Sequence, residues 1–390
     1  MKKIRDLVVL HRGSLLTGFL IIFFSSVLFL PRLGSLVPGH SVYDHPHYLG
    51  LSKDGFLSDI SYAPLKAGQK IMVLADDNNA TLIRFVSVVA VVVASCLLYL
   101  LLRHWHTRRV SLMATFLFAT SSVSLQFAHT SNKHAMLLGV IPTLLLCSVW
   151  FKSKKTLSRL PLISALMALT LYVPGMLVIL PALALVYRRR LLLVWRYVGK
   201  HTRNVSLALF VLLASPLVAA VAMRPAQLKG LLGFAGPFDI SSIRDRAISI
   251  PDQLLYRGFD DPALWLVGTP ILDVATLAFV LLGVYSYVKG PHPLRFRILV
   301  GLVIGVVGLV VLGAVPIYLL LPLVYIFAAS GIALLLQQWF TVFPRNPFAR
   351  NFAVVWMIIL LVIVAGYHVR RSYLAWPNAP ATKQAYQRTE

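Results

Sequence analysis

Long apolar stretches separated by short basic runs are the feature that most restricts how this chain can fold. Crossing the hydrocarbon core of a bilayer takes about 20 mostly apolar residues. Eleven segments approach or reach that length: residues 13–31, 81–102, 110–127, 134–151, 160–173, 174–187, 204–223, 269–288, 298–314, 316–337 and 352–369. The fifth and sixth are short and meet at Pro174-Gly175, so they form a hairpin that either spans the membrane or enters it partly. The sequence therefore predicts an all-α polytopic membrane protein with about eleven transmembrane helices.

The composition fits a chain whose surface mostly faces lipid. Of its 390 residues, 58% are hydrophobic and 13% are charged, whereas a soluble domain carries about 25% charged residues. The formal net charge of +24 would suit a nucleic acid if it were gathered on one soluble face. Here Lys and Arg lie in short runs between apolar segments, which is typical of cytoplasmic loops. The sequence therefore argues against a nucleic-acid partner.

The distribution of charge predicts the orientation of the helices. With the N-terminus in the cytoplasm, 22 of the 37 Lys and Arg and one of the 13 Asp and Glu fall on the inner side. The inner side then carries a net charge of +21 and the outer side +3, as the positive-inside rule requires. We expect a multi-pass protein of the cytoplasmic membrane with its N-terminus inside and its C-terminus outside.

Two segments of the predicted outer side, residues 32–80 and 224–268, are much longer than the others. Loops beyond about 12–15 residues are uncommon unless they are functional or disordered. Both contain aromatic residues, proline and spaced acids, so we expect them to fold into short helices. The predicted organisation is one transmembrane domain over residues 1–369, followed by a short extracytoplasmic tail over 370–390, with any chemistry on the outer face.

The first long segment combines carboxylates with basic side chains close to the predicted membrane surface. These residues are Asp44, His45, His47, Asp54, Asp59 and Lys66, with Arg84 a few positions further on. A carboxylate can act as a general base, and a Lys or Arg can neutralise an anionic leaving group. The alternative, which composition alone favours, is a solvated loop whose charges balance one another.

The run Asp44-His45-Pro46-His47 also carries side chain types that bind zinc. Histidines two positions apart in a loop are common without a metal, and no third or fourth ligand is evident. Cys96 and Cys147 both lie in apolar segments and form no metal-binding or disulfide pattern. We therefore assign no metal site and no cofactor, although a divalent ion is compatible with these residue types.

Two further outer positions carry residues suited to phosphate. The turn after the third apolar segment contains His129, Lys133 and His134, and the second long segment contains Arg257. Cationic side chains at a membrane surface bind phosphate and pyrophosphate groups. The alternatives are a plain polar turn for the first three and an interfacial anchor for Arg257.

Four groups of segments form a recognisable series along nearly the whole chain. They are Arg103-His104-Trp105-His106-Thr107-Arg108-Arg109-Val110 with Phe118-Ala119-Thr120-Ser121-Ser122, Leu171-Tyr172-Val173-Pro174-Gly175, Tyr256-Arg257-Gly258 with Gly268-Thr269-Pro270-Ile271-Leu272-Asp273, and Tyr373-Leu374-Ala375-Trp376-Pro377. In this order they resemble the GT-C glycosyltransferases, and the closest branch is the one shared by protein O-mannosyltransferases and the aminoarabinose transferases of lipid A. Together they resemble the helix hairpins, the later outer loop and the segment leaving the last helix of that branch.

The resemblance implies a GT-C-like fold and an activity. Such enzymes take a sugar from a polyprenyl-phosphate carrier and transfer it, with inversion, to an extracytoplasmic acceptor: a protein, lipid or glycan. Asp44 occupies the place of the general base in the first outer loop. The phosphate of the donor would be held by Lys66, Arg84, His129, Lys133 and Arg257. His45, His47, Asp54, Asp59 and His134 would support the site or the acceptor.

The sequence also departs from the pattern of that branch. His129 stands where many relatives carry Arg, and Lys133-His134 stands where an acidic pair is usual. One alternative is therefore a catalytically reduced relative that binds polyprenyl lipid or partner proteins. Another is a lipid flippase or transporter. The interiors of the predicted helices are nearly free of ionisable residues, which argues against an ion-coupled transporter.

Overall fold

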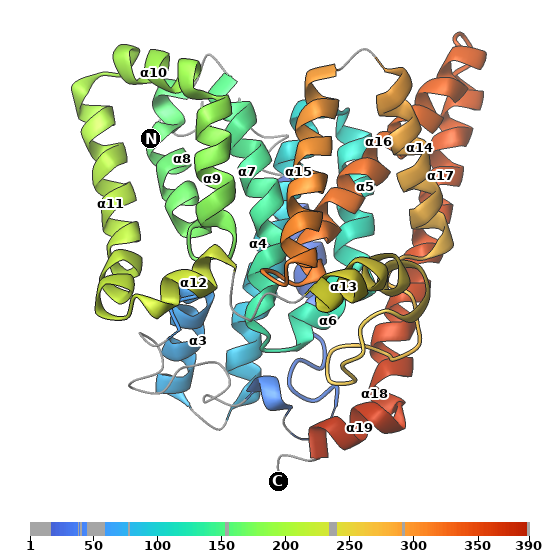
Figure 1. Ribbon diagram of the computed structural model, residues 1–390. Helices are drawn as coiled ribbons and strands as arrows, with labels where there is room; N and C mark the ends of the chain where they lie inside the picture. Colours follow the sequence, from blue (N-terminus) through green and yellow to red (C-terminus); the bar gives the residue numbers. More distant parts are fainter. Residues whose placement is uncertain are drawn as a thin grey trace, which may run out of the picture.

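The structure is a computed structural model that describes residues 17–37, 39, 41–44, 59–76, 79–152, 156–233, 240–290 and 293–387. Throughout these ranges the secondary structure is helical, with turns between the helices and no strand (Figure 1). The all-α prediction is confirmed for the described chain. The predicted supporting residues His45, His47 and Asp54 lie outside the described ranges.

Each predicted apolar segment falls on a helix or on a pair of helices. The helices are Thr17–Phe29, α4 (Ala80–Trp105), α5 (Arg108–Thr120), α6 (Ser122–His129), α7 (Leu137–Lys152), α8 (Thr156–Thr170), α9 (Met176–Val186), α11 (Lys200–Met223), α14 (Val274–Lys289), α15 (Pro293–Val311), α16 (Leu321–Val342) and α17 (Pro347–Arg370). Shorter elements are η1 (Val42–Asp44), α3 (Ala63–Ala75), η2 (Lys133–Met136), α10 (Arg188–Tyr197), α12 (Ala226–Leu232), α13 (Ile240–Asp252), η3 (Gln253–Arg257), η4 (Ile317–Leu320), η5 (Arg371–Ala375), α18 (Trp376–Asn378) and α19 (Pro380–Gln387).

Not every apolar helix is long enough to cross a bilayer by itself. Within the described ranges, five helices meet the length and apolarity needed for a crossing. A sixth arises if α5 and α6, which meet at an angle of 53°, count as one bent span. Thr17–Phe29, α9 and α14 are shorter apolar helices. The described helices are thus compatible with a membrane protein by their length and apolarity, and the count of eleven crossings stays a prediction.

The short helices gather at the two ends of the long ones. In Figure 1, α3, α12, α13, α18, α19 and the C-terminus lie at the lower end, here named the C-terminal face, and α10 lies at the opposite end, here named the α10 face. The described parts of both long segments, 32–80 and 224–268, contain short helices as expected and lie on the C-terminal face. Because α10 begins with Arg188-Arg189-Arg190, the positive-inside rule predicts that its face is cytoplasmic.

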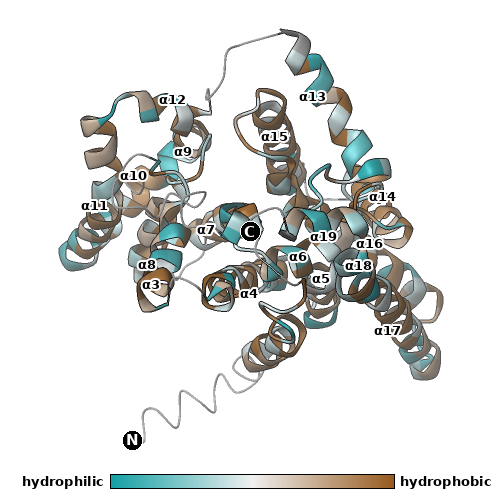
Figure 2. Cartoon of the chain, turned by 90° about the horizontal axis from the view of Figure 1, so that it is seen from below, coloured by the Kyte–Doolittle hydropathy of each residue, from teal (hydrophilic) through white to brown (hydrophobic). Residues whose placement is uncertain are grey.

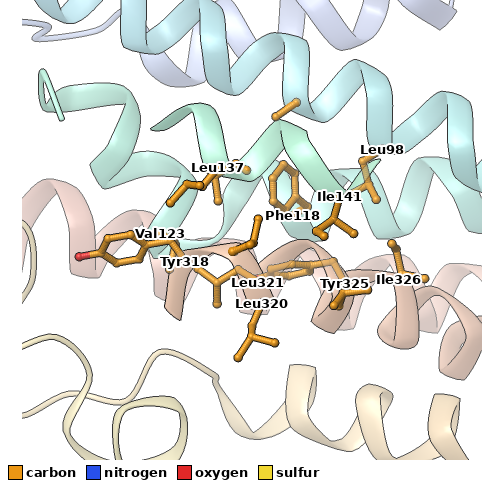
Figure 3. Packing of buried hydrophobic residues seen from close by; sticks show 14 of the residues in the cluster. Leu98, Phe118, Val123, Leu137, Ile141, Tyr318, Leu320, Leu321, Tyr325 and Ile326 are labelled. Carbon is orange, nitrogen blue, oxygen red and sulfur yellow. The ribbon is translucent and has the colours of Figure 1, made fainter. Parts of the chain in front are cut away.

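The centre of the bundle is built around α16. Of its most apolar stretch, 78% is buried inside the protein, against 22% for α11 and 28% for α17. Tyr325 and Ile326 of α16 pack with Phe118, Leu98 and Ile141 from three other helices (Figure 3). Seen from the C-terminal face, hydrophobic residues also cover the helices at the perimeter (Figure 2). Apolar surface on the outside of an apolar core is what a lipid solvent permits.

The helices α14 and α16 cross at two glycines. A Cβ added to Gly283 would lie 1.9 Å from the carbonyl oxygen of Phe327, and one added to Gly331 would lie 2.0 Å from that of Phe279. The two backbones are therefore in direct contact at this point. Small residues are the usual means of such contact between membrane helices.

The described C-terminal residues, 371–387, pack against the body of the protein. Helix α17 continues through η5 into α18 without a gap, so residue 370 marks no break in structure. Trp376 and Tyr386 are each 1% exposed and pack with Val37 and Ala263. The burial of these two large rings holds the tail against both long segments.

A buried polar chain ties α14 to two other helices near the C-terminal face. His368 of α17 lies 3.0 Å from the Oδ2 atom of Asp273 and 2.8 Å from the Oγ atom of Ser122. The order resembles a hydrolase triad, but Ser122 is 1% exposed. A nucleophile must reach its substrate, so we interpret these three residues as a structural link between helices.

Candidate functional site

Asp44 lies in a buried cluster that joins three separate parts of the chain. Arg84 of α4 donates from Nε to Oδ1 at 3.0 Å and from a terminal nitrogen to Oδ2 at 2.7 Å. Ser131 donates to Oδ1 at 2.6 Å, and the backbone and hydroxyl of Ser41 both donate to Oδ2 at 2.9 Å. Each carboxylate oxygen of Asp44 thus accepts two or three hydrogen bonds. We call Ser41, Asp44, Arg84 and Ser131 the Asp44 cluster.

Burial and hydrogen bonding act in opposite directions on Asp44. Burial by itself raises the pKa of the carboxyl group, but the hydrogen bonds and positive charge of Arg84, with those of Ser131 and Ser41, hold the pKa below its ordinary value. The Asp44 residue is 4% exposed and Arg84 is 1% exposed. The carboxylate is therefore ionised and fully occupied, which makes it a strong anchor for the turn at Ser131.

A second cluster of charges surrounds Asp59. The ammonium group of Lys66 in α3 donates to the Asp59 carbonyl oxygen at 2.8 Å and to Oδ2 at 2.6 Å. Lys133 of η2 approaches the same Oδ2 atom at 3.4 Å. Burial lowers the pKa of Lys66, and Asp59 offsets part of that effect. The Lys66 side chain is fully buried, whereas 43% of the Asp59 side chain is exposed. We call Asp59, Lys66 and Lys133 the Asp59 cluster.

The two clusters are neighbours because one turn contributes a residue to each of them. Ser131 belongs to the Asp44 cluster and Lys133 to the Asp59 cluster, and both lie at the start of η2. Asn132 between them accepts a hydrogen bond from the backbone of His134 at 2.8 Å, which caps η2. Gln69 of α3 donates to the Ser131 carbonyl oxygen at 2.8 Å. The turn is therefore fixed by α3 and by its own cap.

The Asp59 cluster opens into a cavity of about 660 Å³ on the C-terminal face, here named the polar cavity. Its walls come from the first long segment, η2, α13, η3 and the ends of α15 and η4. The charged residues of the wall are Asp59, Lys133, Arg246, Asp260 and Asp261. Rings of Tyr62, His134, Phe259 and Tyr318 complete it, with the Phe259 and Tyr318 centroids 4.6 Å apart. The cavity thus combines both signs of charge with aromatic surface.

Three charged residues of the polar cavity, Arg246, Asp260 and Asp261, were not identified as site residues from the sequence. Asp260 is exposed and forms no hydrogen bond or ion pair within the described chain, whereas Asp261 beside it accepts from the Tyr43 hydroxyl and, at 2.9 Å, from the backbone of Ala263. Arg246 of α13 lies against the backbone of Gly313, where an added Cβ would be 2.3 Å from its Nη1 atom. The feature of the sequence that could have indicated Asp260 is the pair of adjacent acids shortly after Gly258.

The turn that presents Asp260 requires glycine. Gly258 has φ of +71°, a conformation that other residues adopt at a cost. A Cβ at this position would also lie 2.2 Å from the Thr269 carbonyl oxygen. The glycine therefore lets the chain reverse after η3 and bring the following acids to the wall of the polar cavity.

Two of the predicted phosphate-binding residues lie away from the polar cavity. His129 is buried, with one ring nitrogen 2.8 Å from the Leu125 carbonyl oxygen and the other 3.2 Å from the Tyr373 hydroxyl. Arg257 faces outward, with 75% of its side chain exposed and Asp252 at 3.6 Å. The structure thus brings together Lys66, Lys133, Asp59 and His134 of the predicted set, and Arg84 with Asp44 beside them.

Within the described ranges, no three His, Cys, Asp or Glu side chains gather closely enough to hold a metal ion. A metal role for Asp44-His45-Pro46-His47 is not tested by this, because both histidines lie outside those ranges. Comparison of the chain with models of known protein families and with curated protein sequences found no match.

Proposed function

We propose that this protein transfers a sugar from a polyprenyl-phosphate donor to an acceptor at the C-terminal face, and that the polar cavity is where the donor and acceptor meet. The observation that supports this most is the lining of that cavity. It places cations, carboxylates and aromatic rings together at one end of a bundle of apolar helices. A sugar phosphate carried on a lipid needs those three kinds of partner at a membrane surface.

The phosphate of the donor fits the two cations that line the cavity. Lys133 and Arg246 stand on different elements, η2 and α13, so an anion between them would be bound from two sides. Lys66 lies behind Asp59 and adds positive charge without direct access. The polyprenyl chain would follow α15, whose last turns line the cavity and whose Ile304 is 66% exposed.

The chemistry requires one free carboxylate near the sugar. The base takes the proton from the acceptor hydroxyl, the acceptor oxygen bonds to the anomeric carbon, and the bond from that carbon to the phosphate oxygen breaks. The polyprenyl phosphate leaves with the electron pair and is stabilised by the cations. We assign the base to Asp260, because it lines the cavity without a partner in the described chain. Asp44 as the base stays a prediction, and the five hydrogen bonds to it favour a positioning role.

The test is the release of polyprenyl phosphate by the purified full chain in lipid nanodiscs, supplied with a panel of polyprenyl-phosphate sugars and acceptors. The Asp260→Asn variant is expected to lower kcat by about 10²- to 10⁴-fold, the usual contribution of a general base, with a smaller change in KM. Asp245→Asn is the matched control, since Asp245 is an exposed acid of α13 outside the cavity lining. Asp44→Asn is measured beside them.

The possible results separate the functions. Loss of turnover in a folded Asp44→Asn variant with normal turnover in Asp260→Asn would return the base to Asp44. Donor binding by the wild-type protein without any turnover would favour a lipid-binding relative that has lost transfer, a function consistent with the full pairing of Asp44. Neither binding nor turnover with any donor would exclude the proposed function.

A further inference from the structure

A second large cavity lies at the opposite end of the bundle and has no part in the proposed transfer. Its volume is about 620 Å³, and its lining includes Tyr285, Tyr287 and Lys289 of α14, Arg295 of α15, and Gln337 and Gln338 of α16. All of these belong to the helix ends of the α10 face. We name this cavity the wedge pocket.

The wedge pocket follows from the way α14 and α16 cross. Both helices run from the C-terminal face toward the α10 face (Figure 1), and their backbones meet at Gly283 and Gly331. The lining residues of α14 begin two positions after Gly283, and those of α16 lie mostly after Gly331. The pocket is therefore the space between α14 and α16 beyond their point of contact. There, longer side chains such as Gln337 and Gln338 stand in the wall, and the backbones no longer touch as they do at the glycines.

The charges of the wedge pocket suit an anion. Lys289 and Arg295 line it, and none of its described lining residues is Asp or Glu. Lys289 lies over the ring of Tyr285, with 4.9 Å between the ammonium and the centroid, and Arg295 lies over the ring of Trp105 at 5.6 Å. These rings hold the two cations at the rim without neutralising them.

A buried hydroxyl in the same wall is poorly satisfied. Tyr287 is 9% exposed, and its hydroxyl oxygen has no partner at good hydrogen-bond geometry within the described chain. The polar group beside it is the Ser330 hydroxyl, which also lines the pocket and donates to the Ile326 carbonyl oxygen at 3.3 Å. Its ring is held by Phe327 and Phe296, with centroids 5.8 Å and 6.4 Å away. A buried polar group without a partner is costly. Since the residue lines the wedge pocket, a ligand there can supply the missing bond.

We propose that the wedge pocket binds the headgroup of an anionic phospholipid, through phosphate contacts to Lys289, Arg295 and the Tyr287 hydroxyl. Phosphate esters are the anions that such a set of donors recognises, and basic pockets between membrane helices on the cytoplasmic side bind anionic lipid headgroups. A soluble phosphate would have the same chemistry. The lipid is favoured because the pocket adjoins exposed apolar residues that acyl chains would cover, such as Val288 at 67% and Trp339 at 38% exposure.

The experiment measures how lipids shift the thermal unfolding of the purified full chain in detergent. Phosphatidylglycerol and cardiolipin are expected to raise the Tm of the wild-type protein, while phosphatidylcholine and sodium phosphate are not. The Lys289→Gln/Arg295→Gln variant is expected to bind the anionic lipids about 10- to 30-fold more weakly, from about 1 kcal/mol for each cation. The control is Arg297→Gln/Arg345→Gln, which removes the same charge from two exposed residues outside the pocket.

A second variant distinguishes a lost ligand contact from a damaged fold. Tyr287→Phe removes a poorly satisfied buried hydroxyl, so without lipid its Tm is expected to equal or exceed that of the wild type. Its affinity for the anionic lipids is expected to fall about 3- to 10-fold, the value of one hydrogen bond. Unchanged lipid binding in the Lys289→Gln/Arg295→Gln variant, an equal loss in the control, or stabilisation by sodium phosphate that competes with the lipids would overturn the proposal.

Discussion

Replacement of Arg84 with alanine is expected to destabilise the folded protein by about 3–5 kcal/mol, the cost of leaving a buried partner charge unpaired. Asp44 would lose two of its five hydrogen bonds and the positive charge that holds its pKa down. The measurement is thermal unfolding in detergent, read beside the yield of monodisperse protein. The exposed Arg224 at the end of α11 provides the control, and its replacement with alanine is expected to change the Tm little.

A double replacement shows whether the charge or the shape of the pair matters. Asp44→Asn/Arg84→Gln removes both charges and keeps polar groups in place, so it is expected to recover a large part of the loss in Arg84→Ala. A double variant as unstable as Arg84→Ala would contradict this account of the cluster.

The ion pair of Asp44 and Arg84 also predicts how stability depends on pH. Because the pKa of Asp44 in the folded protein lies below its ordinary value of 3.8, the stabilising effect of the ionised carboxylate is complete above that pH. The effect is lost as the pH falls further, so the Tm values of the wild type and Asp44→Asn should converge in acid.

Gly283→Ala is expected to be the other strongly destabilising change, by about 3 kcal/mol or more. The added Cβ would lie 1.9 Å from the Phe327 carbonyl oxygen, a backbone atom that cannot rotate away as a side chain can. The helices α14 and α16 would have to separate, and the close packing on which membrane helices depend would be lost. The expected result is a large fall in Tm and in the yield of folded protein.

Gly305→Ala is the matched control for this substitution. Gly305 lies in the neighbouring helix α15, and a Cβ there would meet no atom within 4 Å. Alanine favours a helix over glycine by up to about 1 kcal/mol, so this variant is expected to be as stable as the wild type or more stable. Equal losses in the two variants would show that helix packing at Gly283 is not the cause.

Hydropathy was sufficient to locate the helices but not to count the crossings. Every predicted apolar segment contains helix in its described part, as expected of a backbone that must satisfy its own hydrogen bonds in lipid. Apolarity alone does not reveal where a helix breaks. The number of crossings depends on two such features. One is the 53° bend between α5 and α6 at Ser121, and the other is the short length of α9, which has 11 residues. Both depend on local capping and tertiary packing.

Part of the site was within reach of the sequence. Asp59 and Lys66 are seven positions apart at the start of α3, and their ion pair is a local feature. Two of the three residues that bond Asp44, Arg84 and Ser131, are 40 and 87 positions away in sequence. The sequence of the loop therefore could not show that both carboxylate oxygens of Asp44 are fully hydrogen-bonded. His129 was assigned to phosphate from its position at a helix end, yet the turn of α6 directs it toward Tyr373. The role proposed for Asp260 rests on a difference that the sequence does not contain: the adjacent Asp261 accepts hydrogen bonds from Tyr43 and Ala263, whereas Asp260 accepts none within the described chain.

The most direct test of the proposed transfer is an experimental structure of the protein in nanodiscs with a polyprenyl-phosphate sugar bound. The account predicts density for the phosphate within hydrogen-bond distance of Lys133 or Arg246, with the sugar beside Asp260 in the polar cavity. A donor bound at saturating concentration elsewhere on the protein, with the polar cavity empty, would contradict it.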